Sequence, residues 1–354
     1  MEPLTHFLTG AVLSRAGFNR KTALATFTMT IGAEAADIDL VVNLRGPIYG
    51  FAHHRGITHS FVGVPLVALG VVAGTWVWHR FRRRFWPPKV RPGYPTTPRW
   101  GLLYLLAVLA GLSHILLDFT NSYGVRPFEP FSYRWYAWDI VFIIEPLLYV
   151  VLLGGLVVPA ILRLVSEEVG ARPKGPPGRV AAVLALFGML LVWGVRDYQH
   201  RRAVTALQSG VYDGAEAKRV GAFPYPLNPF QWYAVVETEN RFDRMLVNSL
   251  SGQVDPEERA QVRYKLEETP VTLAAKQSYL GRVYLDWSRF PVEEVQKREP
   301  PQPGYIVRFQ DLRFRYPNSS RGVLSAGVVL DPELSVTEYL WPAFGGKEVA
   351  VAPR

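Results

Sequence analysis

Seven acidic and histidine side chains lie at or near the ends of very apolar segments of this chain. In a segment that enters a bilayer, each such side chain costs roughly 2.5 to 3.5 kcal/mol on insertion scales, so a group of them requires a compensating partner. Imidazole and carboxylate both bind divalent metals, and one ion would compensate several of these groups at once. We therefore expect a metal site built from His6, Asp37, Asp39, His54, His59, His114 and Asp118.

His114 and Asp118 form the pair whose geometry follows most directly from the sequence. They are four residues apart in a segment that must be helical if it spans a membrane. Their side chains therefore project from one face of that helix, one turn apart. Such a pair can hold a metal ion with both side chains. An intrahelical hydrogen bond between the two groups is the alternative that remains open.

The string at residues 53–60 carries further imidazoles just before an apolar run. A glycine permits a tight turn and Thr58 is a favourable N-cap, which would place His54 in a loop and His59 in the first turn of a transmembrane helix. The free N–H groups of that helix start, together with the forked donor of Arg55, would form a cradle for a phosphate. Alternatively, Arg55 extends to the lipid headgroups.

Two carboxylates, Asp37 and Asp39, close the apolar segment 22–36, and Glu34 lies one turn earlier. Acidic groups at a helix C-terminus oppose the helix dipole, so this cluster calls for a cation. Solvated acids at a membrane edge are the alternative. His6 belongs to the set only through the topology derived below, because a lone histidine in an apolar helix is otherwise a packed residue.

The composition limits the kinds of metal site that the chain can form. The chain has 354 residues, of which 49% are apolar, a formal net charge of +9 and no cysteine. Disulfides, iron–sulfur clusters and thiolate zinc sites are thereby excluded. The positive charge is explained by loops that flank membrane spans, and no nucleic-acid partner is expected. The remaining histidines are not expected to be ligands: His53, His79 and His200.

The apolar runs predict the fold class. Four long runs predict membrane-spanning helices, and two shorter runs at 4–16 and 22–36 predict a helical hairpin that enters the membrane. The chain after Asp197 is mixed and polar. We predict a membrane all-α helical bundle over residues 1–197, followed by an extramembrane α+β domain over residues 198–354. The long runs are Ile57–Trp78, Trp100–Phe119, Ile140–Val165 and Val180–Val195.

Within the second domain, alternating patterns and turn signals predict strands, and one segment predicts a helix. The expected helix is Pro256–Glu268. The expected strands are Trp232–Thr238, Phe242–Ser249, Ser278–Trp287, Tyr305–Tyr316 and Gly322–Leu330. No catalytic motif is found in this domain.

The basic residues predict the orientation. The loop from His79 to Arg99 carries seven arginine and lysine residues and no acid, which by the positive-inside rule places it in the cytoplasm. The loop at 163–179 lies two spans later, and the turn at 15–21 is also basic, so both are expected on the same side. The metal-ligand candidates and the second domain then face outward together from a bacterial inner membrane.

These motifs resemble the inner-membrane metal-dependent hydrolases of the YdjM type. The resemblance covers about residues 1 to 165 and includes Asn121-Ser-Tyr-Gly124 and Pro127-Phe128. The His-Arg-Gly-x-Thr-His-Ser string is its specific element, whereas His-x-x-x-Asp alone is not specific. That family is more distantly similar to zinc-dependent phospholipase C and P1-type nucleases, which cleave phosphodiesters with clustered zinc ions. The proline expected before the Asp-x-Asp element is Ala36 here.

Joined to the residues, the resemblance implies a bundle that holds one or more divalent ions near the outer membrane surface. Zinc is the first expectation, with manganese or iron as alternatives. Such ions would activate a water for attack on phosphorus. The implied catalytic residues are Asp37, Asp39 and Arg55, and the implied substrate-binding residues are Arg55, Thr58, Ser60 and Asn121.

A site at headgroup level meets membrane lipids by lateral diffusion. The expected reaction is therefore hydrolysis of a phosphoester in a phospholipid or a lipid-linked phosphate, with the aromatic segments 121–130 and 135–138 as an interfacial lip. Two alternatives stay open: a metal-dependent membrane protease and a non-enzymatic protein with a structural metal. Transport is disfavoured because the spans are nearly free of polar residues. The sequence predicts neither the number of ions nor the oligomeric state.

Overall fold

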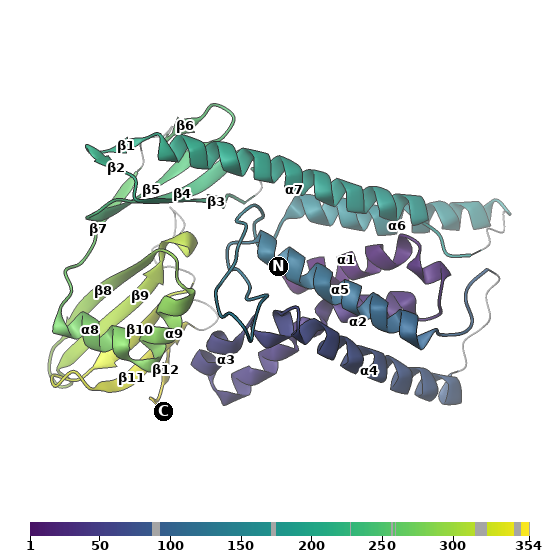
Figure 1. Ribbon diagram of the computed structural model, residues 1–354, viewed down its shortest axis with the longest axis horizontal. Coiled ribbons are helices and arrows are strands. Elements are labelled where there is room, and N and C mark those ends of the chain that lie inside the picture. The colour runs from purple at the N-terminus through teal and green to yellow at the C-terminus, as the bar shows by residue number, and fades with distance from the viewer. Residues whose placement is uncertain are drawn as a thin grey trace. The chain divides into compact units, whose positions relative to one another are not determined.

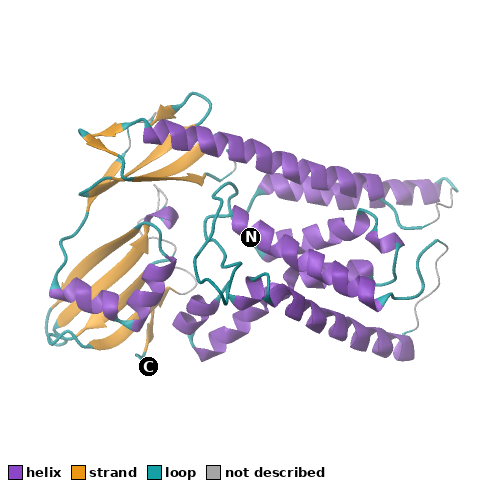
Figure 2. Cartoon of the chain, in the orientation of Figure 1, coloured by secondary structure: helices purple, strands orange, loops and turns teal. Residues whose placement is uncertain are grey.

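A computed structural model of the chain describes residues 1–86, 93–170, 175–226, 228–255, 258, 260–315, 324–342 and 348–353. The chain forms two compact units. The membrane unit comprises Met1–Leu40 and His54–Tyr198, and the C-terminal unit comprises Val41–His53 and Gln199–Arg354. Helices make up the first, whereas the strand ladders lie in the second (Figures 1 and 2). The predicted fold class, a helical membrane region followed by an α+β domain, is confirmed.

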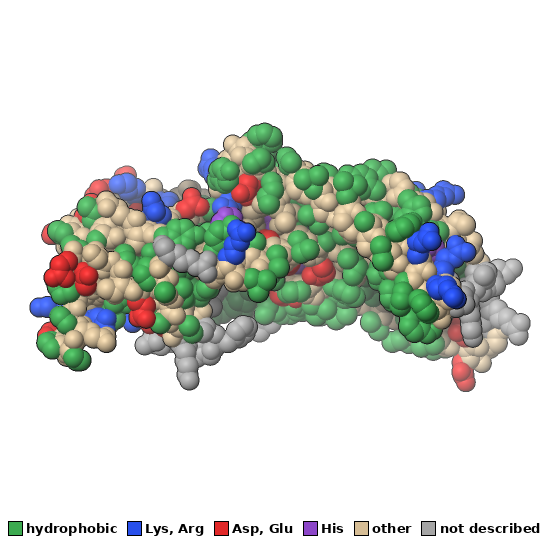
Figure 3. Space-filling view, turned by 90° about the horizontal axis from the view of Figure 1, so that it is seen from below, with side chains coloured by type: hydrophobic (Ala, Val, Ile, Leu, Met, Phe, Trp, Pro, Cys, Tyr) green, Lys and Arg blue, Asp and Glu red, His purple; other side chains and the backbone are tan. Residues whose placement is uncertain are grey.

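Within the described residues, four helices are long and apolar enough to cross a membrane. They match the four predicted spans and are α4 (Gly63–Phe85), α5 (Trp100–Thr120), α6 (Pro146–Glu168) and α7 (Arg179–Gln208). The two shorter runs form α1 (Pro3–Arg15) and α2 (Ala25–Glu34). Figure 3 shows hydrophobic side chains over much of the helical surface in view, as expected for helices in contact with lipid.

Small residues let the helices around α2 approach closely. A Cβ added to Gly10 of α1 would lie 2.6 Å from the Met29 carbonyl oxygen of α2. A Cβ added to Gly32 of α2 would lie 3.3 Å from the backbone of Ala107 in α5. Both contacts are tighter than ordinary packing permits, so α2 is held between α1 and α5 by backbone proximity. This packing fixes the end of α2, from which the acidic ligands extend.

Three basic loops meet at one end of the membrane unit. The backbone N–H of Arg99 donates to Thr22 Oγ1 at 2.8 Å, which joins the α4–α5 loop to the α1–α2 turn. Arg20 donates to the carbonyl of Pro176 at 2.6 Å, which joins that turn to the α6–α7 loop. Figure 3 shows lysine and arginine side chains gathered near this end of the helices. Because α4 begins and α5 ends at the opposite end, the predicted ligands lie away from the basic loops.

The C-terminal unit contains two five-stranded antiparallel sheets and a short hairpin of β1 (Val211–Tyr212) and β2 (Ala215–Glu216). One sheet consists of β3 (Arg219–Pro224), β4 (Gln231–Glu237), β5 (Arg241–Asn248), β6 (Gln253–Val254) and β7 (Gln261–Tyr264). The other has the order β12 (Glu348–Val351), β11 (Val336–Pro342), β10 (Ala326–Leu330), β9 (Gly304–Asp311) and β8 (Pro291–Arg298). Its helices are α3 (Pro47–His53), α8 (Pro270–Gln277) and α9 (Tyr279–Trp287), together with the 3-10 turn η4 (Leu312–Phe314).

Two of the local predictions for this unit are wrong. The segment Ser278–Trp287, expected as a strand, forms helix α9, because Leu280, Tyr284 and Trp287 recur at a helical spacing and are all buried. The segment 256–268, expected as a helix, contains strand β7, which pairs with β5; positions 256, 257 and 259 lie outside the described residues. The strands β4 and β5 match their predictions, whereas β9 and β10 are shorter than predicted: residues 312–314 form the turn η4, and β10 begins at Ala326. Positions 316 and 322–323 of these predictions lie outside the described residues.

Candidate metal centre

Three short stretches of the membrane unit bring the predicted ligands together. His114 and Asp118 lie one turn apart on α5, and both are buried. Asp37 and Asp39 lie in η2, the 3-10 segment Ala35–Arg45 that follows α2. His59 ends η3, the 3-10 turn Ile57–His59 that precedes α4.

Four of these residues form the first donor group, whose ligand atoms all lie within 4.8 Å of one another: Asp37, His59, His114 and Asp118. The two Nε2 atoms of His59 and His114 lie 3.0 Å apart. Asp37 Oδ1 lies 3.3 and 3.6 Å from these two nitrogens, and Asp118 Oδ2 lies 3.4 and 3.3 Å from them. Ligands bonded tetrahedrally at about 2.0 to 2.2 Å are separated by roughly 3.3 to 3.6 Å. The four nitrogen–oxygen separations fit one tetrahedral ion, and the two nitrogens, at 3.0 Å, lie slightly closer than this range.

Asp37, Asp39 and His54 form the second donor group, again with ligand atoms within 4.8 Å of one another. Asp37 belongs to both groups. A carboxylate has two oxygens and can serve two cations, so the arrangement has the donor set for a pair of ions that share Asp37. His54 is half-buried, with Nδ1 at 3.1 Å from Asp39 Oδ1.

The histidines of the first donor group are oriented by acceptors behind them. His114 Nδ1 lies 2.6 Å from the carbonyl oxygen of Ala33, at the end of α2. His59 Nδ1 lies 3.2 Å from Asp39 Oδ2. With the ring hydrogen on Nδ1 in each case, both Nε2 lone pairs face the centre, as is usual for histidine ligands. In these tautomers the two Nε2 lone pairs lie 3.0 Å apart, an arrangement that favours a cation between them.

The acid–base properties of the η2 and η3 residues also call for a cation. Burial alone would raise the pKa of Asp39, but hydrogen bonds from His54 and His59 outweigh it and hold the pKa well below its usual range. Burial would lower the pKa of His59, yet its bonds to Asp37 and Asp39 raise it above the ordinary value. Asp37 and Asp39 therefore favour a positive charge at this position.

The Arg55 guanidinium is buried and engaged with the site. It donates to Asp118 Oδ1 at 2.9 Å, to the Gly124 carbonyl at 3.1 Å and to Asn121 Oδ1 at 3.3 Å. The Arg55 backbone N–H donates to Asp39 Oδ2 at 2.8 Å. Among the described residues, Arg55 Nε and Asn121 Nδ2 have no hydrogen-bond partner although they are buried. These two donors remain for a ligand beside Asp118.

The predicted helix start at Thr58 is wrong. Helix α4 begins only at Gly63, whose N–H donates to Ser60 Oγ at 2.9 Å. Ser60 also donates to the Ile57 carbonyl at 2.8 Å, so its hydroxyl is occupied in starting the helix. Thr58 donates instead to Asp39 Oδ2 at 3.3 Å. The phosphate cradle expected from helix N–H groups at Thr58 is therefore not formed there, because Asp39 competes for the hydroxyl.

His6 lies beside the first donor group. Its ring stacks on the His114 ring with centroids 3.7 Å apart, and its Nε2 is 3.4 Å from Asp118 Oδ1. Neither ring nitrogen of His6 forms a hydrogen bond within the described part of the chain, and the same holds for Asp118 Oδ2. The amino group of Met1 also donates to Asp118. The unsatisfied atoms are thus concentrated around Asp118.

The arrangement of these residues agrees with the comparison to known families. The family model described as YdjM inner membrane protein matches residues 1–203. The chain belongs to the YdjM inner membrane protein family. A Bacillus subtilis (strain 168) protein described as uncharacterized protein YfhP is 27% identical over 289 residues, which is 80% of this chain and 75% of that relative. No solved structure matches the chain.

All of the predicted ligands lie inside the region that matches the YdjM family, whereas most of the C-terminal unit lies beyond it. The histidines set aside as non-ligands lie outside both donor groups of this YdjM-family chain. His53 is exposed and stacks on Tyr49 at 4.0 Å between ring centroids. His200 lies 3.1 Å from the carbonyl oxygen of Ala222.

Two contributions to the site were not predicted. The Ala33 carbonyl that orients His114 is a backbone atom and leaves no signal in residue type. Tyr123, whose ring lies 4.7 Å from the Arg55 guanidinium and 5.8 Å from the His54 ring, belongs to the Asn-Ser-Tyr-Gly motif. That motif is the signal from which its place at the site could have been expected.

Proposed function

We propose that this YdjM-family protein is a membrane-bound metal-dependent hydrolase that uses divalent ions, zinc first, to cleave a phosphoester of a membrane lipid. The observation that carries the proposal is the pair of Nε2 atoms of His59 and His114, 3.0 Å apart and flanked by two carboxylates at tetrahedral spacing. Nitrogen and oxygen donors of this kind suit zinc, and manganese or iron to a lesser degree. When bound, such ions would supply an activated water and neutralise charge on phosphate.

We assign each side chain a role in the proposed reaction from its contacts. Asp37 is the shared ligand and, at 21% exposure, the more accessible carboxylate of the first donor group, so we assign it the face at which water and substrate arrive. Both oxygens of Asp39 are occupied, by His54 and by the Arg55 backbone among others, so it positions the rings. The free N–H of Arg55 would hold a phosphate oxygen beside Asp118.

The lipid substrate is proposed from the surroundings of the site. The donors lie at the start of α4 and the end of α5, where a spanning helix leaves the hydrocarbon. The loop that follows α5 exposes Phe128 and Phe131, and the Phe128 ring packs against Phe61 at 5.4 Å. Aromatic side chains are favoured at the membrane interface. A lipid headgroup is therefore the phosphate most readily brought to these residues.

A combined metal and turnover assay tests the hydrolase proposal. The purified full chain is assayed in neutral micelles for bound metal, for phosphate released from phosphatidic acid, and for glycerol phosphate or glycerol released from phosphatidylglycerol. We expect turnover that is lost with chelator and lost in Asp37→Asn, but kept in His53→Ala. Metal binding without turnover on either lipid would favour a structural ion, and peptide cleavage in place of phosphate release would favour the protease alternative.

The orientation is a further part of the proposal: the basic loops face the cytoplasm, and the metal centre and the C-terminal unit face outward. Because the chain has no cysteine, single cysteines can be labelled cleanly. Thr97, in the α4–α5 loop, and Ser251, in the C-terminal unit, are both exposed. With a membrane-impermeant reagent on intact cells, we expect Ser251→Cys to react and Thr97→Cys to stay unlabelled. The reverse pattern would place the centre in the cytoplasm.

A further inference from the structure

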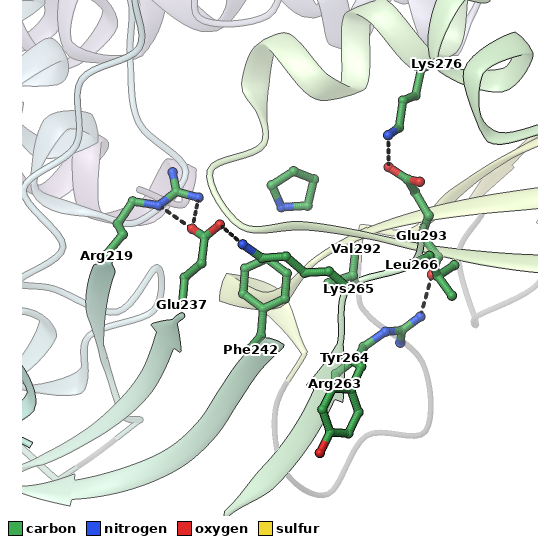
Figure 4. A pocket seen from close by; sticks show the side chains of 11 residues that line it. Arg219, Glu237, Phe242, Arg263, Tyr264, Lys265, Leu266, Lys276, Val292 and Glu293 are labelled. Atoms are coloured by element: carbon green, nitrogen blue, oxygen red, sulfur yellow. Dashed lines mark hydrogen bonds and ion pairs between the residues drawn. The ribbon is translucent and has the colours of Figure 1, made fainter. Parts of the chain in front are cut away.

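The C-terminal unit contains a second concentration of charged side chains, unrelated to the metal centre. A pocket of about 250 Å³ is lined by residues of β3, β4, β5, β7, α8 and β8 (Figure 4). Its floor includes the apolar side chains of Phe242 and Val292. Six charged residues surround it, of which four are basic: Arg219, Arg263, Lys265, Lys276, Glu237 and Glu293. The lining therefore carries an excess of two positive charges.

The strand register places Arg263 on the inner face of its sheet. Phe242 of β5 pairs with Arg263 of β7, and Arg244 pairs with Gln261 two residues along. Directly paired residues point to the same face, as do residues two apart on one strand. Arg263 and Arg244 therefore project to the side on which Phe242 is buried. The strand pairing therefore determines the position of this positive charge on the sheet.

The two carboxylates of the pocket are already used by the other cations. Glu237 accepts from Arg219 at 2.6 Å and from Lys265 at 2.8 Å. Glu293 pairs with Lys276 at 3.2 Å. Arg263 donates only to the main-chain carbonyl of Glu293, at 2.7 Å, and within the described residues no carboxylate forms an ion pair with it. In Figure 4, dashed lines join Arg219 and Lys265 to Glu237, and Lys276 to Glu293.

Two further guanidinium groups lie close to Arg263. Arg244, which is buried, donates to the main-chain carbonyl of Arg315 at 3.3 Å, and its Nε has no hydrogen-bond partner in the described chain. Burial lowers the pKa of Arg263, and the neighbouring charges of Arg315 and Arg244 lower it further. Such crowding is unfavourable unless an anion joins the group. The negative charge of nearby Glu294 raises the pKa of Arg263, but it does not outweigh burial and the charges of the two neighbouring arginines.

We propose that this pocket binds a phosphate group, with Arg263 as its forked anchor and Lys265 and Lys276 at the rim. Arginine presents two parallel N–H donors to phosphate, which suits a residue that still has donors free. The phosphate would come either from a free anion or from a phosphate ester such as a lipid headgroup. The site is independent of the metal centre and of the proposed hydrolysis.

Equilibrium dialysis on the full chain in neutral detergent tests the site, with labelled inorganic phosphate in one arm and labelled glycerol 3-phosphate in the other. Chelator is present throughout, so that the metal centre contributes no affinity. We expect saturable binding that Arg263→Gln weakens at least about tenfold, because charge-assisted hydrogen bonds are lost. Arg298→Gln, at the other end of β8, is the matched control and should bind as the wild type does. The tighter arm identifies the source of the phosphate.

A gain-of-affinity variant guards against misfolding as the explanation. Glu293→Gln removes a negative charge from the lining and leaves Lys276 with one carboxylate, Glu268 at 3.4 Å, so binding should tighten by about fivefold. A damaged fold would not strengthen binding. No saturable binding in either arm, or equal affinity in wild type, Arg263→Gln and Glu293→Gln, would overturn the proposal.

Discussion

Two buried aspartates, one in each unit, differ in whether groups of the chain itself satisfy both of their carboxylate oxygens. Asp311 of the C-terminal unit accepts from Arg313 Nη2 at 2.8 Å, Ser288 Oγ at 2.7 Å and the Arg289 backbone N–H at 2.7 Å. Asp118 of the membrane unit receives Arg55 and the Met1 amino group on one oxygen, while its other oxygen faces the rings of His59 and His114 without a hydrogen bond in the described chain. The chain completes the first site by itself. For the second site, the proposed metal ion would supply the missing partner.

From this comparison we expect substitution of Asp311 to have the largest effect, a loss of stability in the C-terminal unit. Asp311→Ala removes the carboxylate that pairs with the buried Arg313, so the C-terminal unit should lose about 3 to 5 kcal/mol of unfolding free energy. Hydrogen exchange of the β8–β10 amides, followed by mass spectrometry, measures the loss. Ser288→Ala, which removes one hydrogen bond, should cost only about 1 kcal/mol.

Metal content separates the two sites in the same samples. Per folded molecule, it should be unchanged in Asp311→Ala, because that residue supports a different unit. If this variant lost metal in proportion to its loss of protection in β8–β10, the two aspartates would not be independent, and the comparison would fail.

Arg55 should have an intermediate effect, on metal affinity rather than on folding. Its guanidinium holds Asp118 Oδ1 at 2.9 Å, so Arg55→Ala removes a group that positions a ligand without removing a ligand. Loss of such supporting contacts weakens metal binding about 10- to 100-fold. Titration with a competing chelator measures this change, and Arg55→Lys should recover part of it. Wild-type affinity in Arg55→Ala would show that the ion pair has no bearing on the metal.

The two sites should also respond differently to pH. The folded pKa of Asp311 is lowered because Arg313 and the hydrogen bonds to the carboxylate outweigh the opposing effect of burial. Its contribution to stability is therefore complete above the unfolded pKa of about 3.9 and is lost as the pH falls through the lower folded value. Asp311→Asn should remove this acid sensitivity of the C-terminal unit, as hydrogen exchange at stepped pH can determine.

At the metal centre, the direction in which metal affinity changes with pH depends on competition between the metal and a proton. The pKa of His59 in the metal-free protein is raised by Asp37 and Asp39, against the opposing effect of burial, so metal must displace a proton below that pKa. Apparent metal affinity should fall about tenfold per pH unit in this range and level off above it. An affinity that does not change as the medium is acidified would contradict the assignment of His59 as a ligand.

The placement of the candidate ligands could be predicted from the sequence where they lie on a regular helix, and only in part where they lie on irregular segments. The spacing of His114 and Asp118 determines their common face once α5 is a helix. By contrast, Thr58 has the composition of an N-cap, yet its hydroxyl bonds to Asp39, nineteen residues earlier in the chain. A contact of that range leaves no local pattern. Capping rules therefore misplaced the start of α4.

The same limit applies to the C-terminal unit. Helix α9 is rich in aromatic and β-branched residues, which favour strands, and only the spacing of Leu280, Tyr284 and Trp287 indicates a helix. The segment Val41–His53 belongs to this unit although it lies between two ligand segments of the membrane unit. Its Phe51 packs on Trp287 at 5.1 Å between ring centroids, a partner that the local sequence cannot indicate.

The metal content of variants at two histidine positions six residues apart, His53 and His59, tests the central claim most directly. His59→Ala removes a buried ligand of the first donor group, whereas His53→Ala removes an exposed ring outside both donor groups. Metal per folded molecule is measured by elemental analysis on monodisperse protein, with thermal stability recorded on the same samples. We predict that His59→Ala loses bound metal and that His53→Ala retains the wild-type amount. Equal metal content in the two variants would contradict the account.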